Sequence, residues 1–190
     1  FGSVSGINQI ARIIQDLSCG RKHDSRQAVV QIYDKSDIGR PDVPCTCTIQ
    51  FLARGNDLHV VTYMRSNDAY IGLPHDVFAF TWLQEVVARS INHEVGVYKH
   101  MVGSLHIYDK DMPFVENFLD EGIQDPLTMP TMPLGDPWQS IEWLLRNERH
   151  IRGGGRDILP TDGIDDYWTD LARLLLIYAF LKERDGRRIV

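Results

Sequence analysis

The chain has 190 residues, of which 43% are hydrophobic and 24% are charged, as in an ordinary soluble globular protein. Its formal net charge of −6 argues against non-specific binding to nucleic acid, so an anionic ligand would need a local basic cluster. No apolar run approaches the roughly 20 residues of a membrane span. We therefore expect neither a membrane nor direct contact with nucleic acid.

The first half of the chain alternates helical and strand patterns. In chain order we expect a helix, a strand, a β-hairpin that turns at RGND, a second helix and a β-rich segment, over residues 7–17, 27–33, 45–64, 76–92 and 94–108. Asp76 follows Pro74 and fits the N-cap position of the second helix.

The pattern changes after Tyr108. A short helix is expected over 112–122, and a proline-broken loop follows it. Two longer helices are expected over 138–150 and 165–184, joined by a Gly-rich connector that lacks the Lys-Ser/Thr of a phosphate loop. The whole pattern predicts an α+β fold, in which a mixed sheet packs with helices and the C-terminal part is helical. We expect one domain over 1–190.

Three cysteines, Cys19, Cys45 and Cys47, do not suggest a disulfide framework, because their number is odd and two of them lie too close for an easy bridge. A reducing, cytoplasmic setting is therefore expected. The chain has no CxxC pair and no HExxH element, so we expect no metal site.

One candidate for chemistry is Cys45, which follows Pro44 where a strand is expected to begin. Side chains two apart in a strand share a face, so Cys47 should point the same way. The pair could be small core residues. Alternatively, one could be a nucleophile, whose thiolate needs a nearby positive charge such as that of Arg65.

Three polar groups are further candidates, and each also has a purely structural explanation. Basic side chains before the first expected strand are either a solvated loop or a phosphate clamp, and they are Arg21, Lys22 and Arg26. Arg65 and Ser66 leave a strand together, which suits a phosphate. His106 and Tyr108 lie two apart in an expected strand, and could hold sugar hydroxyls or be ordinary half-buried residues.

In combination these motifs are specific. DSRQ, VPC, RSNDAYIGLPHD and HIY, in this order and spacing, resemble the thymidylate synthase family, whose pattern is D-S-R-R, P-C-H, Q-R-S-x-D-x-x-L-G-L-P-F-N and H-x-Y. The opening FGSVSG resembles the family's L-G-P-V-Y-G, and EVGVY resembles E-V-G-D-F. The resemblance covers residues 1–108, whereas 109–190 diverge. We do not find the family's N-terminal region, with its relay Glu, phosphate-binding Arg and folate-facing Trp, in this chain.

The resemblance implies a role for each matching residue. Cys45 would add to C6 of a pyrimidine nucleotide, and Arg65 would favour its thiolate. The substrate-binding residues would be Arg26, Arg65, Ser66, Asp76, His106 and Tyr108. Arg26 would act on the neighbouring subunit's site in a homodimer. Asp68 and Gly72 would face the co-substrate 5,10-methylenetetrahydrofolate, and no metal is implied.

The departures from the family pattern point to a substrate. Asp76 stands where the family has the Asn that reads uracil. An ionised carboxylate only accepts hydrogen bonds, so O4 of uracil, also an acceptor, would face it without a donor, at a cost of roughly 1–3 kcal/mol. The N4 amino group of cytosine is a donor and suits the carboxylate. Asp in this place is typical of the deoxycytidylate and cytidylate hydroxymethylases. His75, where the family has Phe, could help to position a water molecule.

Other departures leave alternatives open. Gln27 replaces the second Arg of D-S-R-R, and Thr46 replaces the His after the nucleophile. We therefore expect folate-dependent 5-hydroxymethylation of CMP or dCMP, with methylation of dUMP or non-catalytic nucleotide binding as the alternatives. The sequence does not choose between the two sugars, nor between phage DNA modification and nucleoside-antibiotic biosynthesis.

Overall fold

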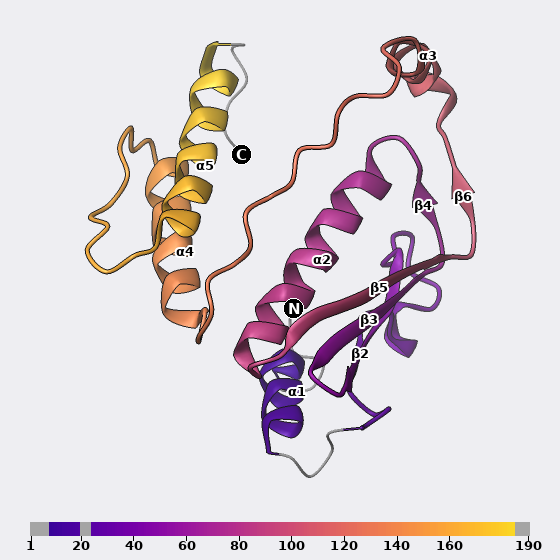
Figure 1. The fold of residues 1–190 in the computed structure, drawn as a ribbon. Helices are drawn as coiled ribbons and strands as arrows, with labels where there is room; N and C mark the ends of the chain where they lie inside the picture. Colours follow the sequence, from indigo (N-terminus) through magenta and orange to yellow (C-terminus); the bar gives the residue numbers. More distant parts are fainter. Residues whose placement is uncertain (1–7, 20–23, 185–190) are drawn as a thin grey trace. The chain divides into compact units, whose positions relative to one another are not determined.

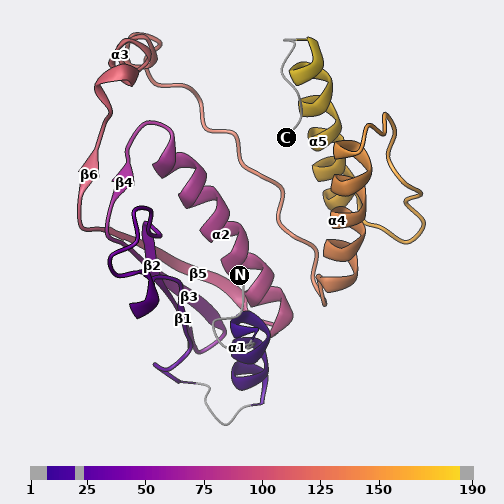
Figure 2. The same ribbon diagram turned by 180° about the vertical axis from the view of Figure 1, so that it is seen from behind.

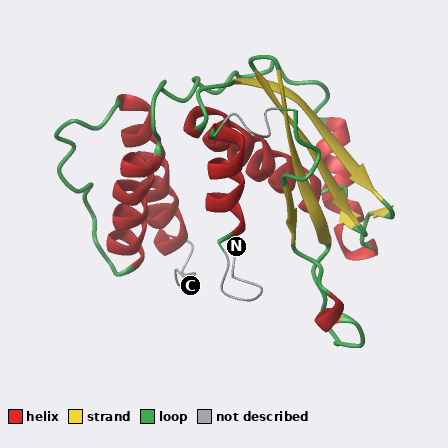
Figure 3. Cartoon of the chain, turned by 90° about the horizontal axis from the view of Figure 1, so that it is seen from below, coloured by secondary structure: helices red, strands yellow, loops and turns green. Residues whose placement is uncertain are grey.

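The computed structural model of the protein describes residues 8–19 and 24–184. The chain divides into two compact units, Phe1–Leu127 and Thr128–Val190. Strands occur in the first unit, and the described helices of the second are α4 (Trp138–Arg152) and α5 (Asp166–Arg184), as the cartoon coloured by secondary structure shows (Figure 3).

The first unit contains helices, short 3-10 turns and strands. In chain order they are α1 (Gln9–Ser18), β1 (Val29–Gln31), η2 (Lys35–Asp37), β2 (Thr46–Arg54), β3 (Asp57–Met64), β4 (Asn67–Asp68), α2 (Gly72–Ser90), β5 (Glu94–Val102), β6 (Leu105–His106), η3 (Asp109–Asp111) and α3 (Met112–Asp120). All the elements expected from the sequence are present, with most boundaries moved by a few residues.

The main sheet has the strand order β1-β2-β3-β5 (Figure 1). The pairs β1–β2 and β2–β3 are antiparallel, whereas β5 runs parallel to β3 and returns to it through α2. Because a parallel neighbour needs a crossover, the long helix between these two strands is what makes the sheet mixed. A separate parallel pair joins β4 to β6. The predicted α+β class, a mixed sheet packed with helices, is confirmed.

One face of the main sheet forms the core. Ile49 and Phe51 on β2 and Val60 on β3 are completely buried on this face. The helix α2 lies along this face of the sheet, and α1 lies beside one end of the sheet, in both opposed views (Figures 1 and 2). The amphipathic helix α1 contributes Ile10 and Ile13 to the same cluster. The apolar residues that recur every second position in the strands and about every 3.6 positions in the helices therefore pack together in one apolar layer.

The start of α2 differs from the sequence prediction. The helix begins at Gly72, four residues before the expected start, and Ile71 occupies the N-cap position. The carboxylate of Asp68 accepts the backbone N–H groups of Ile71 and Gly72 at 2.9 and 3.1 Å. Because Asp68 already satisfies donors at this helix end, Asp76 lies inside the helix and is not its N-cap.

The second unit is held by contacts between α4 and the loop that leads to α5. The indole N–H of Trp143 donates to the carbonyl of Pro160 at 2.8 Å. The buried side chain of Asn147 accepts from the N–H of Leu159 at 2.9 Å and donates to the carbonyl of Trp143 at 3.0 Å. Both expected helices are confirmed. Within the described residues, no helix combines the length and apolarity that crossing a membrane requires.

Candidate functional site

Cys45 and Arg65 meet at the open end of the β2–β3 hairpin, opposite its turn. The N–H of Arg65 donates to the carbonyl of Cys45 at 2.9 Å, which continues the strand pairing by one step. The guanidinium then turns back along the preceding loop, where Nε donates to the carbonyl of Pro44 at 3.0 Å and Nη2 to that of Val43 at 2.9 Å. The same Nη2 lies 3.8 Å from the sulfur of Cys45. The guanidinium thus places a positive charge close to the sulfur.

Cys45 is accessible. It is exposed, and it lies beside a pocket of about 720 Å³ that is lined by residues 37 and 40–45. Cys47 is half-buried, and its thiol faces the carbonyl of Cys45 at 3.8 Å. The pairing of β2 with β3 slips between Thr46 and Thr48, which is a β-bulge at Cys47. The bulge interrupts the period of two on which the same-face prediction for the two cysteines depended.

The short pair β4–β6 brings together two sequence motifs that lie about forty residues apart. Ser66 Oγ lies 3.4 Å from Nδ1 of His106, and Asp68 is the register partner of His106. Strand β6 ends at His106, so Tyr108 lies outside it, contrary to the expectation of one shared strand face. The two rings still meet edge to face, with their centroids 4.9 Å apart.

Asp68 organises the turn into α2. Besides the two N–H groups at the helix start, it accepts that of Tyr70 at 3.1 Å. These backbone hydrogen bonds, above all that of Ile71, hold the pKa of Asp68 below its ordinary value. Gly72 packs tightly beside this turn, because an added Cβ would lie 2.6 Å from Oδ1 of Asn67. Only glycine fits here without a shift of its neighbour.

Asp76 projects from the second turn of α2 into a polar cluster. Burial raises the pKa of Asp76, while the charge of His100, a hydrogen bond from Asn67 and the charge of His75 act in the opposite direction. A carboxyl of this kind holds a proton more readily than one at the surface. That property suits a group that shares a proton with a ligand.

Three members of this cluster were missed by sequence reasoning, and they are Asn67, Tyr98 and His100. Tyr98 and His100 lie on the core face of β5, where their hydroxyl and Nδ1 are 2.6 Å apart. Nε2 of His100 lies 3.1 Å from Nδ2 of Asn67. The available signal was the placement of two polar residues at period two on a face that should be apolar.

The side chains of two predicted residues form no hydrogen bond to the other described members of the group. Arg26 is exposed, and its guanidinium hydrogen-bonds to none of the other described residues, although its carbonyl accepts from Gln50 at 2.9 Å. His75 is exposed and turns Nδ1 to the carbonyl of Ile71 at 2.6 Å. Arg21, Lys22 and the opening FGSVSG lie outside the described residues. Over 8–19 and 24–184 no three His, Cys, Asp or Glu residues gather as a metal site.

This constellation comprises an exposed cysteine beside an arginine, a serine–histidine pair and a half-buried carboxyl. They come from the open end of the β2–β3 hairpin, the link from β3 to β4, strand β6 and helix α2. Residues 2–150 match the model of the family described as thymidylate synthase. The chain therefore belongs to the thymidylate synthase family.

Two curated relatives define the extent of the likeness. The thymidylate synthase of Mycoplasma mobile is 29% identical over 139 residues, which cover 73% of this chain and 46% of the relative. That of Malacoplasma penetrans is 28% identical over 139 residues, covering 72% and 46%. The chain thus spans about half the length of the curated relatives it matches.

Proposed function

We propose that this chain carries the nucleotide-reading core of a folate-dependent enzyme that hydroxymethylates C5 of a cytidine monophosphate, either CMP or dCMP. The observation that carries the proposal is Asp76, a half-buried carboxyl of raised pKa at the position where the family pattern has an amide. Its carboxylate accepts a hydrogen bond from the N4 amino group of cytosine, and a proton shared between Asp76 and N3 of the base completes the pair.

In the proposed reaction, the thiolate of Cys45 adds to C6 and makes C5 nucleophilic. Methylenetetrahydrofolate supplies the one-carbon unit that C5 attacks. Departure of tetrahydrofolate with loss of the C5 proton leaves an exocyclic methylene, to which water adds. Expulsion of the Cys45 thiolate then restores the aromatic ring. His75 is proposed to help position that water from the first turn of α2.

The remaining predicted residues bind the two ligands. Arg65 and Ser66 hold the 5′-phosphate, with Arg65 contributing the part of its guanidinium that does not face the loop carbonyls. His106 and Tyr108 hold a sugar hydroxyl. Asp68 and Gly72 face the pterin, and the depressed pKa of Asp68 keeps it an acceptor for ring N–H groups. No metal is part of the proposed reaction.

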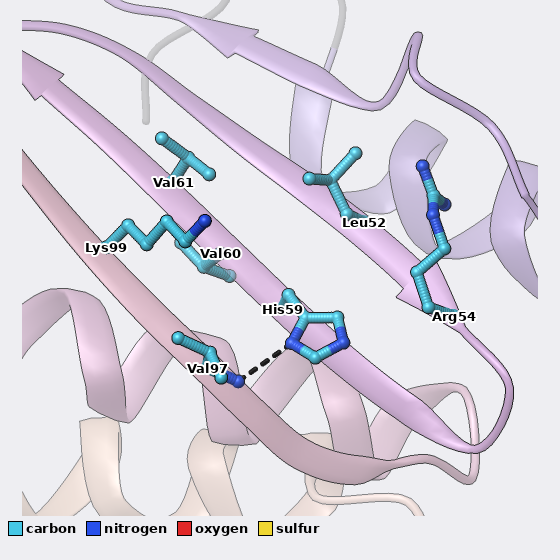
Figure 4. A pocket seen from close by; sticks show the side chains of 7 residues that line it. All are labelled: Leu52, Arg54, His59, Val60, Val61, Val97 and Lys99. Carbon is cyan, nitrogen blue, oxygen red and sulfur yellow. Dashed lines mark hydrogen bonds between the residues drawn. The ribbon is translucent and has the colours of Figure 1, made fainter.

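A homodimer is proposed through the outer face of the main sheet. Val97, Met101 and Tyr63 are exposed on this face by 56%, 54% and 42% of their surface. A pocket of about 270 Å³ lies near the turn of the β2–β3 hairpin, and Leu52, Val61 and Val97 are among the residues that line it (Figure 4). An exposed apolar sheet face favours a partner. Arg26, tied to the same face through Gln50, would then reach the other subunit's site.

The dimer proposal is tested by sedimentation of the protein and of Val97→Glu. We expect a dimer that the substitution dissociates, because a charge would be buried without a partner. Ile123→Glu is the matched control, since Ile123 is fully exposed and follows α3, outside the strands of the sheet. A monomeric wild-type protein would contradict this part of the proposal.

The activity is tested by incubating the protein separately with CMP, dCMP and dUMP in the presence of methylenetetrahydrofolate. Hydroxymethylation releases tetrahydrofolate, whereas methylation oxidises the folate to dihydrofolate, whose absorbance distinguishes the two. We expect tetrahydrofolate and a 5-hydroxymethyl cytidine nucleotide. Dihydrofolate formed from dUMP alone would instead support the methylating alternative, which the names of the two relatives favour. Tight nucleotide binding without turnover would support the non-catalytic one.

A further inference from the structure

A chain of four side chains from three elements ends at Asp76. On β5, the hydroxyl of Tyr98 lies 2.6 Å from Nδ1 of His100. From the other side of the ring, Nε2 lies 3.1 Å from Nδ2 of Asn67 on β4. Asn67 in turn hydrogen-bonds to Asp76 on α2 and lowers the pKa of its carboxyl against the larger effect of burial. Asn67 is itself buried, with 4% of its surface exposed.

The orientation of the Asn67 amide follows from its neighbours. Nδ2 lies 3.3 Å from the sulfur of Met64, a weak acceptor, as well as 3.1 Å from His100. Oδ1 packs against Gly72 on the opposite side. An amide nitrogen only donates, so Nε2 of His100 must accept. A neutral imidazole has one proton, and it therefore lies on Nδ1, from which it is donated to the hydroxyl oxygen of Tyr98.

The charges around His100 agree with a neutral ring. Burial lowers the pKa of His100, and the charge of Asp76 opposes that effect. The described side chains beside the ring include Asp76 from α2, Asn67 from β4, Tyr98 from its own strand and Thr62, its register partner on β3. The ring of Phe80, also from α2, lies with its centroid 6.4 Å from that of His100. Burial also raises the pKa of Tyr98, so its hydroxyl stays protonated.

We propose that Tyr98 is a positioning residue that fixes His100 as its Nδ1–H tautomer and thereby orients Asn67 and the base-reading carboxyl of Asp76. The naming of cytosine as the base rests on the proposed function, whereas the tautomer does not. Tyr98 and Asp76 are both departures from the family pattern, which has Phe in E-V-G-D-F and Asn in L-P-F-N. The two departures thus lie at opposite ends of one hydrogen-bonded chain.

The physical reason is competition between two tautomers. Without the Tyr98 oxygen, the Nδ1–H tautomer of His100 loses its acceptor, and the Nε2–H tautomer becomes competitive. That tautomer points a hydrogen at the Asn67 nitrogen, so the amide must turn over. Asn67 then presents its oxygen where Asp76 needs a donor, and the carboxyl loses its fixed orientation.

The tautomer is measured directly by NMR of the protein labelled with ¹⁵N-histidine, using two-bond ¹H–¹⁵N correlations. The His100 signal is assigned by its loss in His100→Gln. We expect the Nδ1–H pattern in the wild-type protein and an increased Nε2–H fraction in Tyr98→Phe. His59 is an internal reference of opposite sense, because its Nδ1 accepts the N–H of Val97 at 2.8 Å (Figure 4).

The positioning effect is measured as the ratio of the dissociation constants for UMP and CMP. Tyr98→Phe should lower this preference for CMP about threefold to tenfold, the usual range for one hydrogen bond. Tyr178→Phe, in α5, should leave the ratio unchanged. His100→Gln, whose side-chain oxygen can replace Nε2 as the acceptor, should retain more of the preference than His100→Leu.

The outcomes distinguish the tautomer of His100, the positioning role of Tyr98 and the proposed function from one another. An Nε2–H tautomer in the wild-type protein, or a tautomer unchanged in Tyr98→Phe, would overturn the inference whatever the enzyme does. A shifted tautomer with an unchanged nucleotide preference would overturn the positioning role. A wild-type preference for UMP together with the Nδ1–H tautomer would overturn the proposed function and leave the tautomer assignment intact.

Discussion

Nη2 of Arg65 lies 3.8 Å from the sulfur of Cys45 while it donates to the carbonyl of Val43 at 2.9 Å. One guanidinium therefore closes the loop that precedes the cysteine and brings a fixed positive charge to the sulfur. We expect Cys45 to react with iodoacetamide faster than Cys47, and we expect Arg65→Gln to slow that reaction, since the thiolate is the reactive form. Mass spectrometry of the alkylated peptides measures both rates. Equal rates in the wild-type protein and Arg65→Gln would contradict the activating role.

The two neighbouring cysteines should respond differently to substitution. Cys45→Ala is expected to abolish turnover and to leave nucleotide binding largely intact, because it removes only the attacking group. Cys47→Ala is expected to lower stability more than rate, since Cys47 is half-buried in a bulged strand. Turnover and calorimetric binding of the two variants are the measurements. Near-normal turnover by Cys45→Ala would exclude the covalent mechanism.

Asp76→Asn should change base preference. The new amide donates to O4 and accepts from N3–H of uracil, whereas the carboxyl suits cytosine. The ratio of kcat/KM for cytidylate over uridylate should fall by about one to two powers of ten, since a mismatched buried group costs roughly 1–3 kcal/mol. A thermal melt checks that the variant is folded. A variant that keeps the full cytosine preference would show that another residue reads the base.

The two aspartates around the α2 start should have opposite effects on the pH dependence of stability. Asp68 has a depressed pKa, so its contribution is present above the unfolded pKa, near 3.8, and is lost as pH falls through the folded value. Asp76 has a raised pKa, so between 3.8 and its folded value the native state binds the extra proton and stability falls as pH rises.

Urea unfolding from about pH 3 to pH 8 tests this pair. Compared with the wild-type protein, Asp68→Asn should lose most stability above pH 4. Asp76→Asn should instead gain stability against the wild-type protein as the pH rises from about 4 towards the folded pKa of Asp76. The same trend for both variants would be inconsistent with the opposed shifts.

Gly72→Ala should destabilise the protein although the position lies in a helix. In a helix interior, alanine is more stable than glycine by about 0.5–1 kcal/mol, but Gly72 is the first residue of α2 and the added Cβ would lie 2.6 Å from Oδ1 of Asn67. We expect a net loss of roughly 1–3 kcal/mol from overpacking. In the Asn67→Ala background the same substitution should cost much less, and chemical denaturation of the four proteins completes the cycle. Equal costs in both backgrounds would show that Asn67 is not the obstacle.

Hybrid dimers test whether Arg26 acts across the proposed interface. Inactive Cys45→Ala and Arg26→Ala subunits, when mixed, should regain activity, because one site of the hybrid carries both defects and the other carries neither. Tagged subunits allow the hybrid to be isolated and its turnover to be measured. No recovery in a verified hybrid would place Arg26 in its own subunit's site.

The sequence by itself determined most of the secondary structure and the family. Periodic apolar residues predict α1, β2, β3 and α5 because burial of one face imposes that period locally. Short motifs whose residue types are fixed by chemistry predict Cys45, Arg65 and Ser66 as site residues. Such motifs are recognised from the sequence without knowledge of their spatial neighbours.

Only the tertiary structure decided which groups surround Asp76. The helix starts at Gly72 because Asp68, four residues earlier at the end of β4, supplies the capping acceptor, which is a local contact. Tyr98 and His100 come next to Asp76 because β5 runs parallel to β3 beneath α2, which is a long-range pairing. The pKa of Asp76 is likewise a property of burial. Sequence determines what a side chain can donate or accept, whereas packing decides which partners it has and how much water it keeps.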